Sequence, residues 1–208
     1  MVYVTGTALE LDTALLRDLG HYRYRVFVER LGWKLPDARD GTEWDRFDTP
    51  QTVHVVALDA QGRIQGCARL LPTTGPYLLA EVFPELMGRQ RCPRADHVWE
   101  LSRFAAIDLA SAPASGHTLG SPAALALLRR AMQDARHHGA RELVSVSPVA
   151  IERILRRGGF AYAHLGAPMD IDGQHLFACS LALSAPRSNR LPVREGVAAN
   201  GQARDWGC

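Results

Sequence analysis

Two short apolar segments joined by a tight turn constrain the fold of this chain more than any other feature of its sequence. Residues 53–58 and 64–71 are rich in Val, Ile, Leu and Ala, and the turn Asp59-Ala60-Gln61-Gly62 separates them. Apolar runs of this length bounded by Asp and Gly are typical of β-strands, and so short a turn leaves the two strands antiparallel. The sequence therefore predicts a β-hairpin over residues 53–71.

Helical patterns flank this hairpin. Residues 9–31 place apolar side chains at steps of three and four, and Asp12 is a candidate N-cap. The polar residues 34–52 that follow form a long loop, and loops of that length are often functional lids. A second helix is predicted over residues 121–138, beginning with a Ser-Pro cap and ending near Gly139.

The remaining apolar segments complete the predicted domain. We expect an extended piece and a short helix over residues 77–87, a helix over 150–157, and strands over 98–107, 143–146, 160–164 and 176–183. Strands that occur before and after helices, with several short connections, favour a mixed α/β sheet. Residues 1–185 are expected to form a single domain, and the Pro-, Arg-, Gly- and Ala-rich residues 186–208 a flexible tail.

Composition excludes several classes of function. With 24 basic and 22 acidic side chains, the net charge of +2 does not indicate nucleic-acid binding. The four cysteines lack the close spacing of a zinc site, so no metal is expected. We find no signal-peptide pattern and no apolar run long enough to span a bilayer. The sequence thus predicts a cytoplasmic protein that has neither nucleic-acid nor membrane partners.

Five short strings occur in order along the first half of the chain. They are Tyr22-Arg23-Tyr24-Arg25-Val26-Phe27, Leu31-Gly32-Trp33, Trp44-Asp45-Arg46-Phe47-Asp48, Cys67-Ala68-Arg69-Leu70-Leu71 and Val98-Trp99-Glu100-Leu101-Ser102-Arg103-Phe104. In this order and spacing they closely resemble strings of the acyl-homoserine lactone synthases, the LuxI-type enzymes that make bacterial quorum-sensing signals.

The resemblance implies a fold and a reaction. The fold is α/β (α+β) and related to the GNAT acyltransferases, with a central mixed, mostly antiparallel sheet flanked by helices. In the reaction, the amine of S-adenosylmethionine takes an acyl group from a thioester on acyl carrier protein. The methionine carboxylate then closes a lactone and expels methylthioadenosine. S-adenosylmethionine is a substrate, so no cofactor is expected.

Charged residues within the strings are the candidates for this chemistry. Acylation needs a base for the amine and stabilisation of the thioester oxygen. Glu100 is the candidate base, directly or through a water, and the alternative is that it only pairs with an arginine. Together with Glu100, the other charged residues of the strings have a net charge of zero; they are Arg23, Asp45, Asp48, Arg69 and Arg103. Such a set is typical of a hydrogen-bonded network, which either only shapes the pocket or also binds substrate. We expect Asp45, Arg69 and Arg103 near the substrate, with Asp45 and Arg103 catalytic, and Arg23 and Asp48 as supports of the same site.

Aromatic and hydroxyl side chains complete the predicted substrate site, namely Phe27, Trp33, Phe83, Phe104, Ser102 and Ser145. A ring face near a desolvated sulfonium contributes about 1–2 kcal/mol. Trp33, beside the polar loop, is the strongest candidate, and core packing is the alternative for the phenylalanines. Glu100 and Arg103 are three residues apart, so a regular strand directs them to opposite faces. If both face one cleft, a β-bulge must interrupt the strand.

The resemblance also implies features of the acyl donor. Family members that prefer 3-oxo chains commonly carry Thr in the strand where this chain has Ser145 and Ser147, which favours an unsubstituted hexanoyl or octanoyl chain. Acyl carrier protein is strongly acidic, and Arg153 and Arg157 are the residues expected to bind it. A solvated helix face is the alternative for these arginines.

Two other functions compete with this interpretation. A coenzyme A-dependent N-acetyltransferase has the same fold, but residues 115–121 lack the Gly-rich pyrophosphate-binding pattern of that class. A non-catalytic sensor of S-adenosylmethionine has no need of Glu100 as a base. Both are disfavoured.

Overall fold

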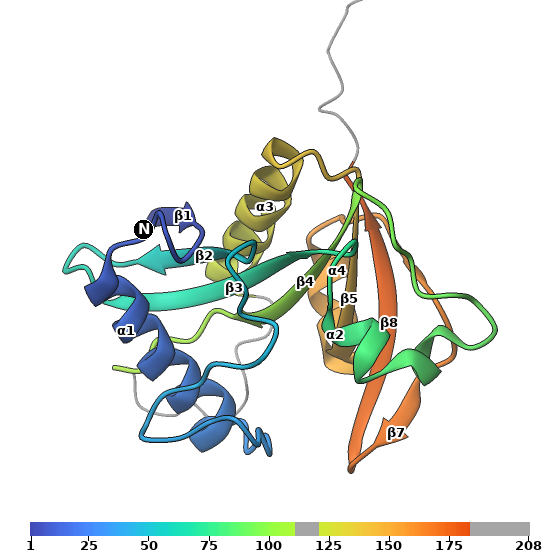
Figure 1. The fold of residues 1–208 in the computed structure, drawn as a ribbon, viewed down its shortest axis with the longest axis horizontal. Coiled ribbons are helices and arrows are strands. Elements are labelled where there is room, and N and C mark those ends of the chain that lie inside the picture. The colour runs from blue at the N-terminus through green and yellow to red at the C-terminus, as the bar shows by residue number, and fades with distance from the viewer. Residues whose placement is uncertain (111–120, 184–208) are drawn as a thin grey trace, which may run out of the picture.

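The computed structural model describes residues 1–110 and 121–183, which build an eight-stranded sheet with helices on both faces (Figure 1). The strand order is β1-β2-β3-β4-β5-β8-β6, and β7 pairs with β8. Every neighbouring pair is antiparallel except β4 and β5. The strands are β1 (Val2–Gly6), β2 (Val53–Leu58), β3 (Ile64–Pro72), β4 (Val98–Ala105), β5 (Glu142–Pro148), β6 (Tyr162–His164), β7 (Met169–Ile171) and β8 (Gln174–Ala182). This mixed, mostly antiparallel sheet confirms the predicted fold class.

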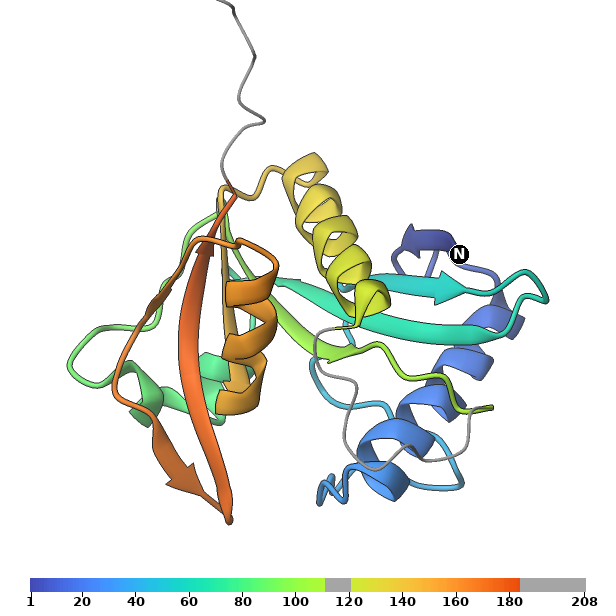
Figure 2. The same cartoon turned by 180° about the vertical axis from the view of Figure 1, so that it is seen from behind.

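Helices cover the sheet from two sides, as Figures 1 and 2 show from opposite directions. One face carries α1 (Thr13–Arg23) and α2 (Leu78–Glu81), and the other carries α3 (Pro122–His137) and α4 (Glu152–Arg157). A π-helix, Tyr24–Arg30, continues α1, and short 3-10 helices occupy Pro84–Met87 and Val149–Ile151. Within the described ranges, no helix combines the length and apolar character needed to cross a membrane.

Two predicted caps are present. The Asp12 carboxylate accepts the N–H groups of Ala14 and Leu15, and the Ser121 hydroxyl accepts the N–H of Ala124. Each satisfies backbone donors that lack partners in the first turn of a helix. The predicted start of the first helix at residue 9 is wrong, because the Asp12 cap begins the helix at Thr13.

The hairpin is formed as predicted by β2 and β3. The extended piece expected within residues 77–87 is absent from the structure, which has α2 and the 3-10 helix Pro84–Met87 there. Strands β1 and β7 were not predicted, since their five and three residues are too short to show a clear pattern. The predicted tail, residues 186–208, and nearly all of residues 115–121 lie outside the described ranges.

The gap between β4 and β5 determines where a ligand can enter. These parallel strands pair only between Val98–Glu100 and Glu142–Val144 and then separate (Figure 2). Just beyond the last pair, the Ser145 hydroxyl donates to the carbonyl of Leu101 at 2.8 Å. A sheet that opens in this way leaves space between two strands that would otherwise be in contact.

Candidate active site

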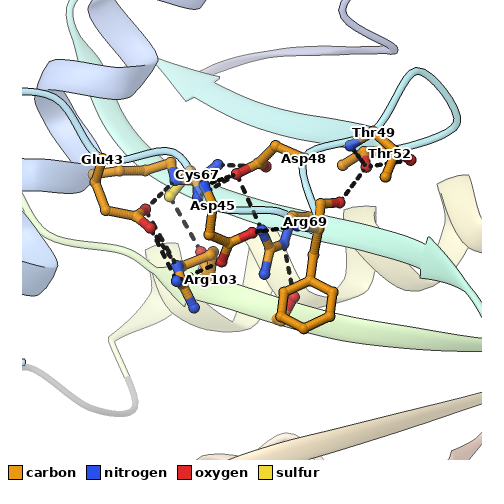
Figure 3. A network of polar contacts seen from close by, with 11 residues as sticks. Glu43, Asp45, Asp48, Thr49, Thr52, Cys67, Arg69 and Arg103 are labelled. Atoms are coloured by element: carbon orange, nitrogen blue, oxygen red, sulfur yellow. Dashed lines mark hydrogen bonds and ion pairs between the residues drawn. The ribbon is translucent and has the colours of Figure 1, made fainter. Parts of the chain in front are cut away.

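A buried network of charged side chains lies between α1, the loop 31–52 and the sheet (Figure 3). Three arginines and three acids balance its charge, and their side chains are at most 11% exposed. Its members are Arg23, Glu43, Asp45, Asp48, Arg69 and Arg103. Paired and hydrogen-bonded charges of this kind can remain ionised inside a protein, whereas isolated ones cannot.

Arg23 links the end of α1 to the loop. Its Nε donates to Glu43 Oε2 at 2.6 Å, and its Nη1 and Nη2 donate to the two oxygens of Asp48 at 2.8 and 3.0 Å. Asp48 Oδ2 also accepts the N–H of Asp45 at 2.8 Å. The two parallel hydrogen bonds fix the orientation of the Asp48 carboxylate relative to the Arg23 guanidinium, and the opposite charges attract each other. Arg23 and Asp48 therefore join the end of α1 to the loop, and their predicted role as supports of the site stays a prediction.

Arg69 and Arg103 attach the sheet to the same loop through Asp45, which lies between them in Figure 3. Arg69 Nη1 donates to Asp45 Oδ1 at 2.6 Å, and Arg103 Nη2 donates to Asp45 Oδ2 at 2.7 Å. Arg69 Nε donates to the Ser102 hydroxyl at 3.0 Å. Arg69 Nη2 is buried and has no hydrogen-bond partner among the described residues.

Arg103 reaches the network because β4 is irregular at this residue. The register between β3 and β4 shifts between Cys67 and Arg69, and Arg103 has a left-handed φ of 48°. A non-glycine residue with positive φ is unusual, and an extra residue in one strand turns the next side chain to the other face. The bulge brings Arg103 to the face where Glu100 also lies, as predicted from their spacing.

Glu43 was missed by the sequence analysis. It is fully buried and accepts hydrogen bonds from both Arg23 and Arg103, at 2.6 and 2.9 Å. The prediction that Glu100 balances the charge of the network is therefore corrected, because Glu43 supplies the third negative charge. Glu43 occurs in a polar loop, and nothing in the local sequence separates it from solvated acids nearby.

Electrostatics keep the network acids charged. Burial alone would raise the pKa of Asp48, but the guanidinium groups of Arg23 and Arg69 outweigh it and lower that pKa well below its usual range. Burial acts on Glu43 in the same direction, and Arg23 and Arg103 outweigh it to lower its pKa. Asp48 and Glu43 consequently remain charged across the neutral pH range.

Glu100 occupies a separate place on the same face of the sheet. Its two carboxylate oxygens accept the N–H groups of Leu78 and Leu79, at 2.9 and 2.7 Å, at the start of α2. Burial raises the pKa of Glu100 to about 7, although these two hydrogen bonds and the charges of Arg69 and Arg103 act to lower it. Glu100 makes no ion pair with any arginine in the described residues.

A pocket of about 350 Å³ opens beside this network, in the gap between β4 and β5. Five residues of the predicted substrate site line it: Trp33, Ser102, Arg103, Phe104 and Ser145. Most of the other lining residues are apolar. The charged end of the pocket, at Arg103, thus continues into an apolar wall, a combination that suits a substrate with one polar and one hydrocarbon part.

Other predicted site residues lie behind this lining. Phe27 is fully buried, stacks on Trp33 with ring centroids 4.8 Å apart, and lies beneath the Arg103 guanidinium at 5.7 Å. Phe83 is not among the lining residues and packs against the apolar cluster around α2. Phe27 therefore supports the wall formed by Trp33, while Phe83 occupies the core-packing alternative.

A narrow hollow extends from the apolar end of the pocket. Pocket and hollow share Leu101, Phe104 and Ser145 among their walls, and the hollow adds side chains from α3, α4 and β8. These additional residues are Leu128, Leu155, Cys179 and Leu181. No charged side chain lines the hollow, but its volume of about 20 Å³ admits little more than one water, so an acyl chain must displace its apolar walls to enter.

The two arginines expected to bind a carrier protein lie on α4. Arg153 and Arg157 are exposed, and within the described residues neither makes an ion pair. Arg156, between them, pairs with Glu152 at 3.2 Å. Both predicted residues are accordingly accessible cations.

Comparisons with known proteins identify the family. The profile of the family "Autoinducer synthase" matches residues 8–191. The chain belongs to the autoinducer synthase family. An acyl-homoserine-lactone synthase of Acinetobacter nosocomialis is 43% identical over 180 residues, covering 86% of this chain and 98% of that protein. The predicted family, and the acyltransferase class of enzyme it implies, are thereby confirmed.

Solved structures agree with this assignment. TofI, in a ternary complex with an inhibitor and methylthioadenosine (MTA), is 44% identical with a TM-score of 0.76, and the match covers 89% of this chain and 93% of TofI. BjaI, a CoA-dependent acyl-homoserine lactone synthase solved with S-adenosylmethionine and isopentyl-CoA, is 25% identical with a TM-score of 0.75, over 86% and 82% of the chains. A protein from Lactobacillus plantarum described as a "putative N-acetyltransferase", 20% identical with a TM-score of 0.59, shares the fold.

Proposed function

We propose that this chain makes an N-acyl-homoserine lactone from S-adenosylmethionine and an unsubstituted hexanoyl or octanoyl thioester of acyl carrier protein. The observation that carries the proposal is the pocket beside Arg103, which joins a charge-balanced network to an apolar hollow. The charged end suits the methionine part of S-adenosylmethionine. The apolar wall of the pocket suits the acyl chain, which would extend into the hollow as the hollow widens.

Acylation forms an amide and breaks a thioester. The amine of S-adenosylmethionine loses a proton and attacks the carbonyl carbon, and the carrier thiolate leaves. Glu100, with a pKa raised to about 7 by burial, is suited to accept that proton near neutral pH. Because both of its oxygens already accept backbone N–H groups, we propose that the proton reaches it through a water. Arg103, on the pocket wall, stabilises the negative charge on the thioester oxygen.

Lactonisation needs less assistance from the protein. The methionine carboxylate attacks its own γ-carbon, the carbon–sulfur bond breaks, and methylthioadenosine leaves as a neutral thioether. The protein must hold the carboxylate in line with that bond. Arg69 is the candidate for this role, because its Nη2 has a hydrogen to donate and no partner among the described residues. Its side chain is fully buried behind the pocket-lining Ser102, so the carboxylate reaches it only if this wall opens.

The acyl donor is proposed on different grounds. Ser145, at the junction of pocket and hollow, uses its hydroxyl on the Leu101 carbonyl, which leaves an apolar path for an unsubstituted chain. The exposed cations Arg153 and Arg157 favour an acidic carrier protein. BjaI uses CoA donors on the same fold, so donor identity has to be tested directly.

Product mass spectrometry tests this function. The purified protein would receive S-adenosylmethionine with acyl carrier protein thioesters of four to twelve carbons, and with matching coenzyme A thioesters. We expect N-hexanoyl or N-octanoyl homoserine lactone plus methylthioadenosine, formed faster from the carrier thioester. Faster turnover of coenzyme A thioesters would overturn the carrier assignment, and acylation of another amine without lactone would overturn the function.

A further inference from the structure

Trp44 separates Glu43 from Asp45, the two acids that hold Arg103 at 2.9 and 2.7 Å. Its indole ring lies against Gly20 of α1. A residue whose neighbours on both sides bind the same arginine is well placed to determine where that arginine lies. What Trp44 contacts therefore matters for the pocket wall.

Gly20 accommodates the indole because it lacks a side chain. A Cβ atom at Gly20 would lie 2.6 Å from Trp44 Nε1 and 3.0 Å from Trp44 Cε2, distances at which one group must move. The Gly20 carbonyl also accepts the N–H of Glu43 at 3.0 Å. Glycine within a helix is less stabilising than alanine. Close approach of the loop to α1 is the structural reason for this glycine, which lies in the middle of the helix.

One charged group and one further ring also contact Trp44. The Arg23 guanidinium lies over the indole, 4.8 Å from its centroid, and the His54 ring meets it edge-on at 5.6 Å. Burial lowers the pKa of His54 to about 4, so this ring is neutral at pH 7. The indole is thus held by α1, by a network arginine and by β2.

We propose that Gly20 and Trp44 are positioning residues that together set the location of residues 43–48, and through Glu43 and Asp45 the location of Arg103 on the pocket wall. The effect on turnover rests on the proposed function. Arg103 already has the left-handed backbone of the β4 bulge, and its ion pairs run to this loop. Misplacing a catalytic group by about 1 Å can reduce rate on the order of 100-fold.

The test is a pair of substitutions made separately and together. Gly20→Ala overlaps with the indole, and we expect kcat/KM for S-adenosylmethionine to fall on the order of 10- to 100-fold. Alanine is the better helix former, which offsets part of the cost of the overlap, so the variant should still unfold in a single cooperative transition. Trp44→Phe removes the overlapping Nε1, and the double variant should recover most of the lost activity. Asp18→Ala, at an exposed position of α1, is the matched control and should behave as wild type.

Three results would overturn the positioning role of Gly20 and Trp44. Wild-type activity of Gly20→Ala, or equal losses in Gly20→Ala and the double variant, would overturn the proposal. If Gly20→Ala does not fold, Trp44→Ala tests the same contact without overlap, and an unchanged KM for S-adenosylmethionine would contradict it. Calorimetric titration with S-adenosylmethionine, read in all variants, keeps this proposal separate from the lactone assignment, because a wild-type protein that binds but makes no lactone would refute only the function.

Discussion

The two faces of β3 and β4 differ sharply in chemistry although they share the same backbone. Toward α1 and the loop, the strands present Arg69, Ser102 and, through the bulge, Arg103. Toward α3 they present Ala68, Leu70 and Leu101 in an apolar cluster. The period of two in a strand separates a charged face from an apolar one, and the pocket lies where the gap beside β4 joins them.

Different interactions stabilise the two faces. The apolar face depends on burial of hydrocarbon, which is insensitive to pH. The charged face depends on opposite charges that are expensive to bury alone. Substitutions on the two faces should therefore differ in how their effect on the unfolding free energy depends on pH, and in which substrate they affect.

Glu100→Gln is expected to have the largest effect on the charged face. Loss of a general base costs about 10²- to 10⁴-fold in rate. In the wild type, kcat should rise with pH through about 7, the raised pKa of buried Glu100, and this rise should be absent in the variant. Single-turnover acylation against pH measures both, with Glu142→Gln on β5 as the matched control. A near-normal rate with the same pH profile would remove Glu100 as the base.

The same carboxyl gives a stability prediction of defined sign. A raised folded pKa means that the neutral form of Glu100 favours folding at low pH, and that this contribution is lost as pH rises through about 7. The unfolding free energy of the wild type should thus fall relative to Glu100→Gln over that interval. Denaturant titrations at pH 5 and pH 8 would show it, and a constant difference would contradict it.

Asp48→Asn tests how much the charged face contributes to stability, for comparison with the apolar face. Breaking a buried pair costs about 3–5 kcal/mol, because Arg23 and Arg69 lose a charged partner. The pKa of Asp48 is lowered in the fold, so its stabilisation is present above the unfolded pKa of about 4 and is lost as pH falls through the folded value. The cost measured by urea unfolding should shrink with acidification.

Leu127→Ala is the matched change on the apolar face. Leu127 lies on α3 and is fully buried in the apolar cluster, and truncation of such a side chain costs about 2–5 kcal/mol. Here the cost should not change between pH 6 and pH 2, the interval over which the cost of Asp48→Asn should shrink, since no charge is involved. If both variants showed the same pH dependence, the distinction between the faces would be wrong.

The smallest effect is expected at the surface. Reversing the charge of Arg153 and Arg157 should raise KM for an acyl carrier protein thioester. The binding free energy should weaken by about 0.2–1 kcal/mol per exposed charge, and by less at high salt. KM for a coenzyme A thioester should not change in parallel. Arg17→Glu, exposed on α1, is the control. An equal increase for both donors would argue against a carrier surface.

Features with local causes were predictable from the sequence. The Asp12 and Ser121 caps, the hairpin of β2 and β3 and the mixed sheet follow from residue types within a few positions of one another. The bulge at Arg103 was predicted conditionally, from the three-residue spacing to Glu100. Strings in the first half of the chain were enough to indicate the family.

Features with distant causes were not predictable. Glu43 is buried because Arg23 and Arg103 lie there, and Arg103 is 60 residues away in sequence. Gly20 shows no turn chemistry, and its reason is the indole of Trp44 from another segment. A single sequence gives no signal for such contacts, since each residue looks ordinary among its neighbours.

The two ends of the pocket have different substrates in the proposed function: the charged end binds S-adenosylmethionine, and the apolar wall with the hollow beyond it binds the acyl chain. Independent titration of S-adenosylmethionine and of four- to twelve-carbon donors, with lactone as the readout, tests it in Arg103→Lys and Leu128→Ala. Arg103→Lys loses the planar guanidinium, and should impair kcat/KM for S-adenosylmethionine without altering the order of chain preference. Leu128→Ala enlarges the hollow and should shift preference toward longer chains, with KM for S-adenosylmethionine unchanged. A changed chain preference in Arg103→Lys, or an equal effect of Leu128→Ala on both substrates, would contradict the claim.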